Sequence, residues 1–336
     1  MKIFSFRSFV AITVAVTLLI VLVGCGRNLK SPILGQPETS LDTAVAESVQ
    51  PAKIAPEVTI WVHGTALVPQ IMPNFFHRKP GLNLALVYEE RYHLRKVANS
   101  FNTQSPELFP LEHFYIFGWN GKLNFQERKK AARELYHELM NLHGLYYEKY
   151  GIGPRIKMIT HSHGGNVALN MAKVKENSPD FAISELIMLA CPVQAETMHL
   201  VSDPLFKKVY SFYSESDLIQ IIDPQGLYHN KTTAHAFFSK RLFPPHPNVC
   251  QIKSKMGNRG LAHIDFLLIR FISNMPAIMK EIAERQSTDQ SGFFSLSIPT
   301  RKTAPFHRRR VNKFTLAGEP RPQLRSHQSA QTQATL

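Results

Sequence analysis

The chain has 336 residues, of which 44% are hydrophobic, and it carries a formal net charge of +14. This length and apolar content exclude a wholly disordered protein, because disordered chains have too little apolar surface to bury. The charge suggests an acidic partner, either nucleic acid or an anionic membrane face. Segment 286–336, however, supplies much of the excess, with eight Lys or Arg against two acidic residues.

The first 25 residues have the pattern of a targeting segment. Basic residues at positions 2 and 7 precede an apolar run, Phe9 to Val23, that is short for a membrane span of about 20 residues. The run ends in Leu-Val-Gly-Cys, which resembles the bacterial lipobox, where the Cys thiol receives a diacylglyceryl group. This resemblance implies that Cys25 anchors the protein in a cell envelope. Gly26 in the next position, rather than Asp, implies the outer membrane if the source is a diderm bacterium. The alternatives are an ordinary cleaved signal or a single anchor helix with an incidental cysteine.

Composition divides the rest of the chain into three parts. Residues 26–56 are polar and Pro-containing without apolar periodicity, which predicts a flexible tether. Residues 57–285 are expected to form the folded domain. Segment 286–336 is basic and rich in Gln, Ser, Thr and Pro, which predicts a disordered tail that is either solvated or in contact with anionic lipid or polymer.

Within 57–285, short apolar runs alternate with segments of helical length. Most of the runs are continuous rather than alternating, as in strands buried on both faces. The pattern predicts an α/β fold with a mostly parallel central sheet and helices on both faces. The expected strands are Val58–Val62, Asn83–Val87, Phe114–Phe117, Ile156–Thr160, Glu185–Ala190, Lys208–Tyr213 and Val249–Lys253. The expected helices are Gln126–Tyr150, Asn166–Lys175 and Ile264–Glu284.

One strand runs into a helix through the turn His161-Ser162-His163-Gly164-Gly165. A nucleophile exposed at such a corner needs small neighbours, because its backbone is strained and the helix must approach closely. The segment resembles the H-S-x-G-G elbow of lipase- and esterase-like α/β-hydrolases, with Ser162 as nucleophile. Thr160 departs from the G-x-S-x-G pattern, because it stands where the first Gly is usual. An ordinary Ser-Gly turn is the alternative for this motif alone.

The first strand ends in a His-Gly-Thr turn at residues 63–65. In the hydrolases that the chain resembles, such a turn supplies one backbone N–H to the oxyanion, and the residue after the nucleophile supplies another. The resemblance therefore implies Thr65 and His163 as oxyanion donors, with Ala66 as the alternative to Thr65.

The acid and the base are expected at the ends of later strands. Asp217 follows the strand 208–213, and Glu215 and Asp223 are its rivals. His263 lies in a loop just before an apolar helix, from which its ring can reach the nucleophile. The chain order Ser162, Asp217, His263 is that of the α/β-hydrolases.

Other polar and aromatic residues have plainer interpretations. Trp119 resembles part of an F-x-W-x-G segment of lipases and is expected to pack in a wall. His161 and His163 have no third ligand nearby, so no metal is expected; His163 is expected at the pocket mouth and His161 below it. Cys191 and Cys250 are predicted to be free and buried, since the sheet places them two strands apart.

Two apolar segments are candidates for covering the site. Residues 225–248 contain several aromatic side chains among basic ones and suggest a cap or lid, or a surface excursion. Residues 67–80 are a second candidate for an acyl-binding wall.

Together these features predict a lipid-anchored serine hydrolase that needs no cofactor and cleaves carboxylic esters through an acyl-enzyme on Ser162. Thioester or amide hydrolysis and acyl transfer stay open, because they use the same machinery. A non-catalytic envelope lipoprotein that binds through this scaffold is the second hypothesis, and a polyanion-binding protein that acts through its tail is the third. We expect a monomer with a lipid or acyl-ester substrate and no specific nucleic-acid partner.

Overall fold

The computed structural model describes residues 54–65, 79–175, 181–222, 242–286, 292–299 and 314–319. The chain divides into Met1–Ile54 and Ala55–Leu336, and the described helices and strands all belong to the second unit. The signal segment with Cys25, most of the predicted tether, and most of the two candidate covering segments lie outside the described residues. Within those residues, no helix has the length and apolar character needed to cross a membrane.

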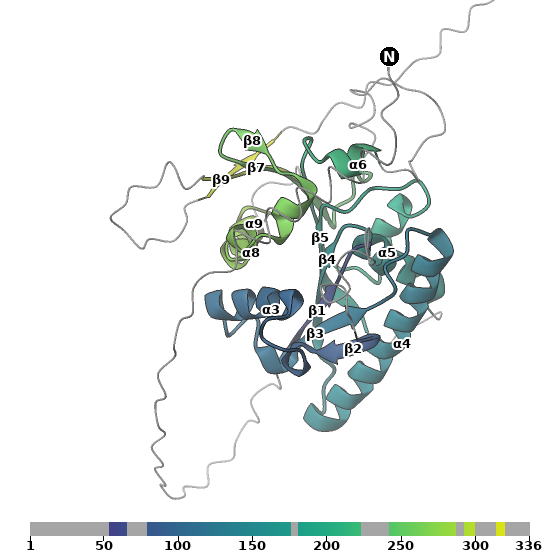
Figure 1. The fold of residues 1–336 in the computed structure, drawn as a ribbon. Helices are drawn as coiled ribbons and strands as arrows, with labels where there is room; N and C mark the ends of the chain where they lie inside the picture. Colours follow the sequence, from purple (N-terminus) through teal and green to yellow (C-terminus); the bar gives the residue numbers. More distant parts are fainter. Residues whose placement is uncertain are drawn as a thin grey trace, which may run out of the picture. The chain divides into compact units, whose positions relative to one another are not determined.

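A single mixed sheet organises the described part of the chain (Figure 1). Its strand order is β10-β9-β7-β6-β5-β4-β1-β3-β2, with the two-residue strand β8 paired to β7. In this spatial order, each neighbouring pair from β9 to β3 is parallel. Strand β2 pairs antiparallel with β3, β8 with β7, and β10 with β9. The strands are β1 (Glu57–Val62), β2 (Gly81–Leu84), β3 (Phe114–Gly118), β4 (Arg155–His161), β5 (Ile183–Leu189), β6 (Val209–Tyr213), β7 (Val249–Met256), β8 (Arg259–Gly260), β9 (Phe293–Ile298) and β10 (Thr315–Gly318).

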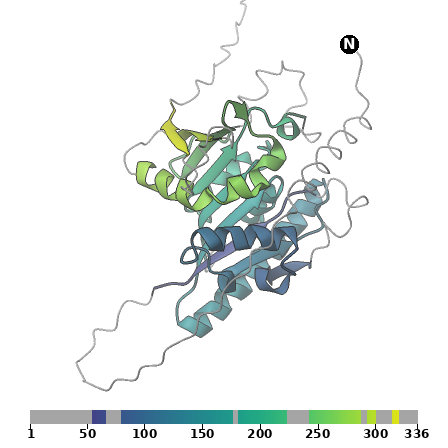
Figure 2. The same cartoon turned by 60° about the vertical axis from the view of Figure 1, so that its left-hand side comes forward.

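Helices cover both faces of this sheet (Figures 1 and 2). On one face lie α4 (Phe125–Tyr150) and α5 (Gly164–Val174), and on the other lie α3 (His93–Gln104), α8 (Ile269–Ile272) and α9 (Met275–Gln286). Side chains of β1 alternate between the two cores, with Val58, Ile60 and Val62 in one and Trp61 in the other. This alternation follows from the two-residue period of a strand and explains why the buried strands read as continuous apolar runs.

The long helix α4 has a defined start and end. The Asn124 side chain accepts hydrogen bonds from the backbone N–H groups of Gln126 and Glu127, at 2.7 and 3.3 Å. At the other end Gly151 has a φ of 69°, a left-handed conformation that terminates helices. The helix predicted at Gln126–Tyr150 is therefore confirmed.

Two predicted elements differ from the structure. The strand expected at Asn83–Val87 is an antiparallel edge strand at Gly81–Leu84, followed by a 3-10 turn at Ala85–Val87. The helix expected at Ile264–Glu284 is broken into a 3-10 turn (η4, His263–Leu267), α8 and α9. Pro276 lies in the first turn of α9, where its missing N–H is tolerated, and a continuous helix through that position is disfavoured.

The predicted boundary at residue 285 is wrong. Strand β9 pairs parallel with β7, and β10 pairs antiparallel with β9, so parts of segment 286–336 belong to the sheet. Phe293, Phe294, Leu296 and Ile298 are all buried. These four apolar residues lie in a segment of six, with two serines between them. The surrounding segment is polar and basic, and its average composition led to the prediction of disorder.

The two cysteines have the predicted arrangement. Cys191 follows β5, Cys250 lies on β7, and β6 runs between these strands. Both thiols are free and buried.

Candidate active site

Ser162 occupies a sharp corner between β4 and α5. Its φ is 54°, an unusual value for a residue other than glycine, and its side chain is buried. The Ser162 N–H donates to the Leu189 carbonyl at 2.9 Å, and the Ser162 carbonyl accepts from the Gly165 N–H at 3.0 Å. Hydrogen bonds on both sides hold the strained residue in place.

Close packing around this corner explains two of its glycines. A Cβ on Gly164 would lie 2.4 Å from the Val62 carbonyl oxygen, and a Cβ on Gly64 would lie 2.6 Å from the Cβ of Ser162. Both distances are well inside van der Waals contact. Position 64 therefore requires glycine because the Ser162 side chain lies against it.

Thr160 fits beneath the elbow despite its departure from the usual glycine. The residue is fully buried, and its hydroxyl lies 3.4 Å from the Ile187 carbonyl oxygen on the neighbouring strand β5. The extra side chain therefore packs toward β5.

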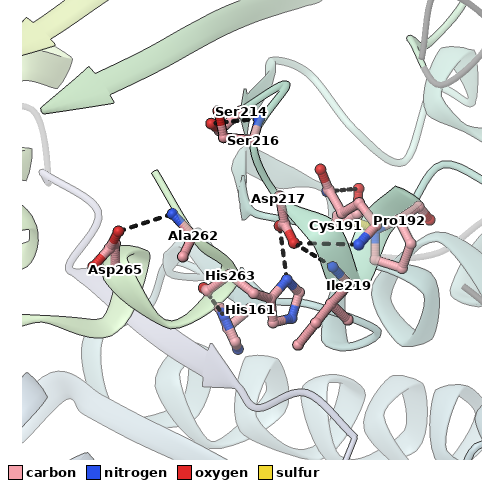
Figure 3. Close-up of polar contacts among 11 residues, drawn as sticks. His161, Cys191, Pro192, Ser214, Ser216, Asp217, Ile219, Ala262, His263 and Asp265 are labelled. Carbon is pink, nitrogen blue, oxygen red and sulfur yellow. Dashed lines mark hydrogen bonds and ion pairs between the residues drawn. The ribbon is translucent and has the colours of Figure 1, made fainter. Parts of the chain in front are cut away.

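Asp217 and His263 lie in direct contact (Figure 3). The His263 Nδ1–H donates to Asp217 Oδ2 at 2.8 Å, although the two residues are 46 positions apart. Asp217 is completely buried between β6 and α6 (Leu218–Ile222), and its Oδ1 accepts the backbone N–H groups of Ile219 and Gln220 at 3.1 and 3.2 Å. A carboxylate on Nδ1 leaves Nε2 free of a proton and able to accept one.

The rival carboxylates are not placed at His263. Glu215 is 56% exposed and its carboxylate lies 2.7 Å from Lys253 Nζ. Asp223 lies outside the described residues. Of the described candidates, Asp217 is the one that contacts His263.

The loop that carries His263 is held by a second acid. Asp265 Oδ2 accepts the Ala262 backbone N–H at 2.8 Å and the Arg259 guanidinium at 2.6 Å. The hydrogen bond from Arg259 to Asp265 raises the pKa of the arginine above its ordinary value. These contacts tie the residues on either side of His263 to each other.

The predicted oxyanion donors lie at the ends of two adjacent strands. Thr65 follows β1, and His163 immediately precedes α5, next to Ser162. The Thr65 hydroxyl is buried and has no hydrogen-bond partner within the described part of the chain. Ala66, the alternative to Thr65, lies outside the described residues. The His163 ring is buried and its Nδ1 lies 3.3 Å from Asn166 Nδ2, so it does not stand openly at a pocket mouth.

Two features decide the fold. A strained serine occupies a strand-to-helix corner in the middle of a mostly parallel sheet, and the contacting Asp217 and His263 follow later strands in the chain. The fold is that of an α/β-hydrolase. Comparisons with protein-family models and with curated proteins find no match.

Solved hydrolase structures share a distant likeness with this chain. The phospholipase PlaB of Legionella pneumophila, in complex with thio-NAD, is 14% identical, with 52% of this chain and 42% of that one covered and a TM-score of 0.29. An esterase of Pyrobaculum calidifontis is 13% identical, with coverages of 70% and 77% and a TM-score of 0.36. An acetyl ester-xyloside bifunctional hydrolase of Caldicellulosiruptor lactoaceticus is 11% identical, with coverages of 71% and 86% and a TM-score of 0.33. The chain spans less than half the length of the phospholipase.

Trp119 makes contacts in the candidate site that the sequence did not indicate. It is buried in the core as predicted, but its indole Nε1–H also donates to the His63 carbonyl at 2.9 Å, and its backbone N–H donates to His63 Nε2 at 3.2 Å. The two rings stack with centroids 5.6 Å apart. Because Nε2 accepts, the proton of neutral His63 is on Nδ1, which donates to the Gly64 carbonyl at 2.7 Å. Trp119 thereby holds the turn that leads to Thr65.

His161 lies against His263. Its ring centroid is 4.8 Å from that of His263, and its Nε2 is 3.2 Å from the His263 carbonyl oxygen. Burial, with a smaller contribution from His263, lowers the pKa of His161 from 6.5 to about 3. His161 is therefore neutral at physiological pH. Among the described residues, no group of three or more His, Cys, Asp or Glu side chains is arranged to hold a metal.

Proposed function

We propose that this protein is a serine hydrolase that cleaves carboxylic esters through an acyl-enzyme on Ser162. The observation that supports this most directly is the buried hydrogen bond between Asp217 and His263, because it prepares the imidazole to accept a proton at Nε2. The strained elbow supplies the second requirement, a serine held at a fixed corner.

The chemistry follows from these groups. His263 Nε2 takes the proton from Ser162 Oγ as that oxygen attacks the ester carbonyl, and the buried Asp217 carboxylate stabilises the imidazolium. Backbone N–H groups of Thr65 and His163 stabilise the oxyanion, each contributing about 2.7 to 4 kcal/mol. The imidazolium then protonates the leaving alcohol, and water deprotonated by His263 attacks the acyl-enzyme. Proton transfers balance within this cycle, so no cofactor is needed.

Two exposed apolar side chains that lie near the acid and the base in the sequence favour an apolar acyl group. Leu218, which follows Asp217 directly, is 60% exposed, and Ile269, just past the turn that contains His263, is 52% exposed. Exposed apolar side chains suit an acyl chain or a lipid surface better than a charged substrate. A lipase- or esterase-like activity is therefore the form of hydrolysis that we propose.

Labelling with a fluorophosphonate probe tests the proposal. Full-length protein purified in mild detergent should be labelled. The Ser162→Ala and His263→Ala variants should not be, because the first lacks the nucleophile and the second lacks the base that activates it. Ser184→Ala is the matched control: this serine donates to the Ile156 carbonyl at 2.7 Å near the start of β5, away from the elbow. Folded wild-type protein that resists the probe would instead favour a non-catalytic binding protein.

Membrane attachment is a separate proposal that rests on the sequence around Cys25. We propose that Cys25 carries the lipid and that the protein is a monomer held in the cell envelope, at the outer membrane in a diderm. Cells fed an alkyne-bearing fatty acid should incorporate it into the wild-type protein and not into Cys25→Ser. Incorporation that persists in Cys25→Ser would refute lipidation at this residue.

A further inference from the structure

His161 joins two parts of the site that are distant in the sequence. It is the last residue of β4 and directly precedes Ser162, while His263 lies 102 positions further along the chain. Figure 3 shows the two imidazoles side by side, with the His161 ring directed at the backbone of His263. His161 is buried, with 8% of the residue exposed, so this contact is sheltered from water.

The partner atom determines which nitrogen of His161 holds the proton. A backbone carbonyl oxygen can only accept, so the 3.2 Å contact with Nε2 requires an Nε2–H donor. A ring that carries its proton on Nε2 has none on Nδ1 unless it is charged, and burial keeps His161 uncharged by lowering its pKa to about 3. His161 therefore adds no positive charge beside His263 when His263 becomes protonated.

We propose that His161 is a positioning residue, whose Nε2–H holds the backbone of His263 against the nucleophile elbow. Asp217 orients the His263 ring from Nδ1, and Asp265 binds the loop at Ala262, but neither contact fixes the distance between the base and the strand that carries Ser162. The bond from His161 does, because β4 leads directly into the serine. This inference rests on the proposed function.

Two substitutions separate a hydrogen-bond role from simple packing. His161→Gln keeps an N–H donor at nearly the position of Nε2, while His161→Phe keeps the volume and the aromatic ring and removes the donor. If the hydrogen bond positions the base, kcat falls about tenfold or more in His161→Phe with KM within about twofold, since a small displacement of reacting groups is costly. His161→Gln then retains kcat within about threefold of wild type. A better rate in His161→Phe than in His161→Gln would overturn the proposal.

The control is a histidine outside the site whose ring also makes a hydrogen bond. His113 lies in the 3-10 turn before β3, and its Nδ1 is 2.6 Å from the Tyr146 hydroxyl. His113→Phe also removes a histidine hydrogen bond, and it should leave kcat within about twofold. Thermal unfolding of each variant by circular dichroism identifies any that fail to fold.

Nuclear magnetic resonance tests the inference without turnover, so it separates failure of this inference from failure of the proposed function. In wild-type protein labelled with 15N-histidine, the His161 signals, identified by their absence in His161→Gln, should show a protonated Nε2. The His263 Nδ1 proton should give a sharp downfield signal that broadens in His161→Phe and persists in His161→Gln. An Nδ1-protonated His161, or an unaltered His263 signal in His161→Phe, would overturn the positioning role even if the protein hydrolyses esters.

Discussion

Replacing Asp217 by Asn should remove nearly all activity while leaving the fold in place. Oδ1 of Asp217 accepts two backbone N–H groups, from Ile219 and Gln220, whereas Oδ2 accepts one proton from His263. An asparagine must put its carbonyl oxygen where the two N–H groups point, so its NH2 group faces His263 Nδ1. Two donors cannot share that contact, and the imidazole responds by moving its proton to Nε2.

The size of the effect follows from this change of tautomer. With a proton on Nε2, His263 cannot accept one from Ser162, and the equivalent change in a Ser-His-Asp site of another fold lowers kcat by about 10⁴. That factor corresponds to about 5.5 kcal/mol of transition-state stabilisation. The helix start at Ile219 and Gln220 keeps its acceptor, so stability should change much less than activity.

The assay is the rate of p-nitrophenyl ester hydrolysis, with fluorophosphonate labelling as a second readout. Glu215→Gln is the matched control, because Glu215 lies two residues away, is largely exposed and pairs with Lys253. It should keep its rate within about twofold, as expected for an exposed ion pair. A rate in Asp217→Asn above about a tenth of wild type, or an equal loss in Glu215→Gln, would refute this role of Asp217.

Three further predictions concern packing, titration and the C-terminal strands. Gly64→Ala places a Cβ 2.6 Å from the Cβ of Ser162, so it should lower activity about 100-fold. Gly144→Ala is the control, because a Cβ at this position on α4 meets open space. It should preserve activity and raise the free energy of unfolding, measured in urea, by about 1 kcal/mol. Burial lowers the pKa of His161 to about 3 in the folded protein, so the unfolded chain protonates this histidine at a higher pH than the folded one does. The stability that comes from keeping His161 neutral is therefore complete above pH 6.5 and is lost as the pH falls toward 3. Between pH 7 and 4.5 the free energy of unfolding should therefore drop by about 2 to 3 kcal/mol more in wild type than in His161→Gln, and equal slopes in urea titrations would contradict this. Deleting 287–336 removes the buried side chains of β9, each worth about 1.5 to 3 kcal/mol, and should give insoluble protein. The control is deletion of 320–336, which keeps β9 and β10 and should leave the melting temperature unchanged. If the 287–336 deletion is soluble and fully active, β9 is dispensable.

Local sequence patterns predicted much of the fold because their causes are local. Continuous apolar runs identified most of the buried strands, and the apolar spacing of α4 identified the longest helix. The elbow was also recognisable, because a strained serine with glycines beside it needs a particular short sequence. Short or edge elements were less visible: β2 was misplaced by two residues at its start, and α3 was not predicted.

The C-terminal strands show where composition misleads. Segment 286–336 is polar and basic on average, yet Phe293–Ile298 completes the sheet beside β7. A short segment with four apolar residues among six becomes a strand only if a sheet edge is available to pair with it, and β7 supplies that edge. Sequence alone does not reveal which edges remain open.

By itself, then, the sequence predicted the fold class, the elbow at Ser162 and the candidate residues Asp217 and His263 that follow it in the chain. Three contacts were decided by the tertiary structure. Asp217 is the carboxylate that contacts His263, His161 contacts the His263 backbone, and Trp119 bonds the turn before Thr65. These contacts join residues 46, 102 and 56 positions apart. The physical reason is range: helix and strand formation depend on neighbours within a few residues, whereas a hydrogen bond between distant segments exists only after the sheet has brought their ends together.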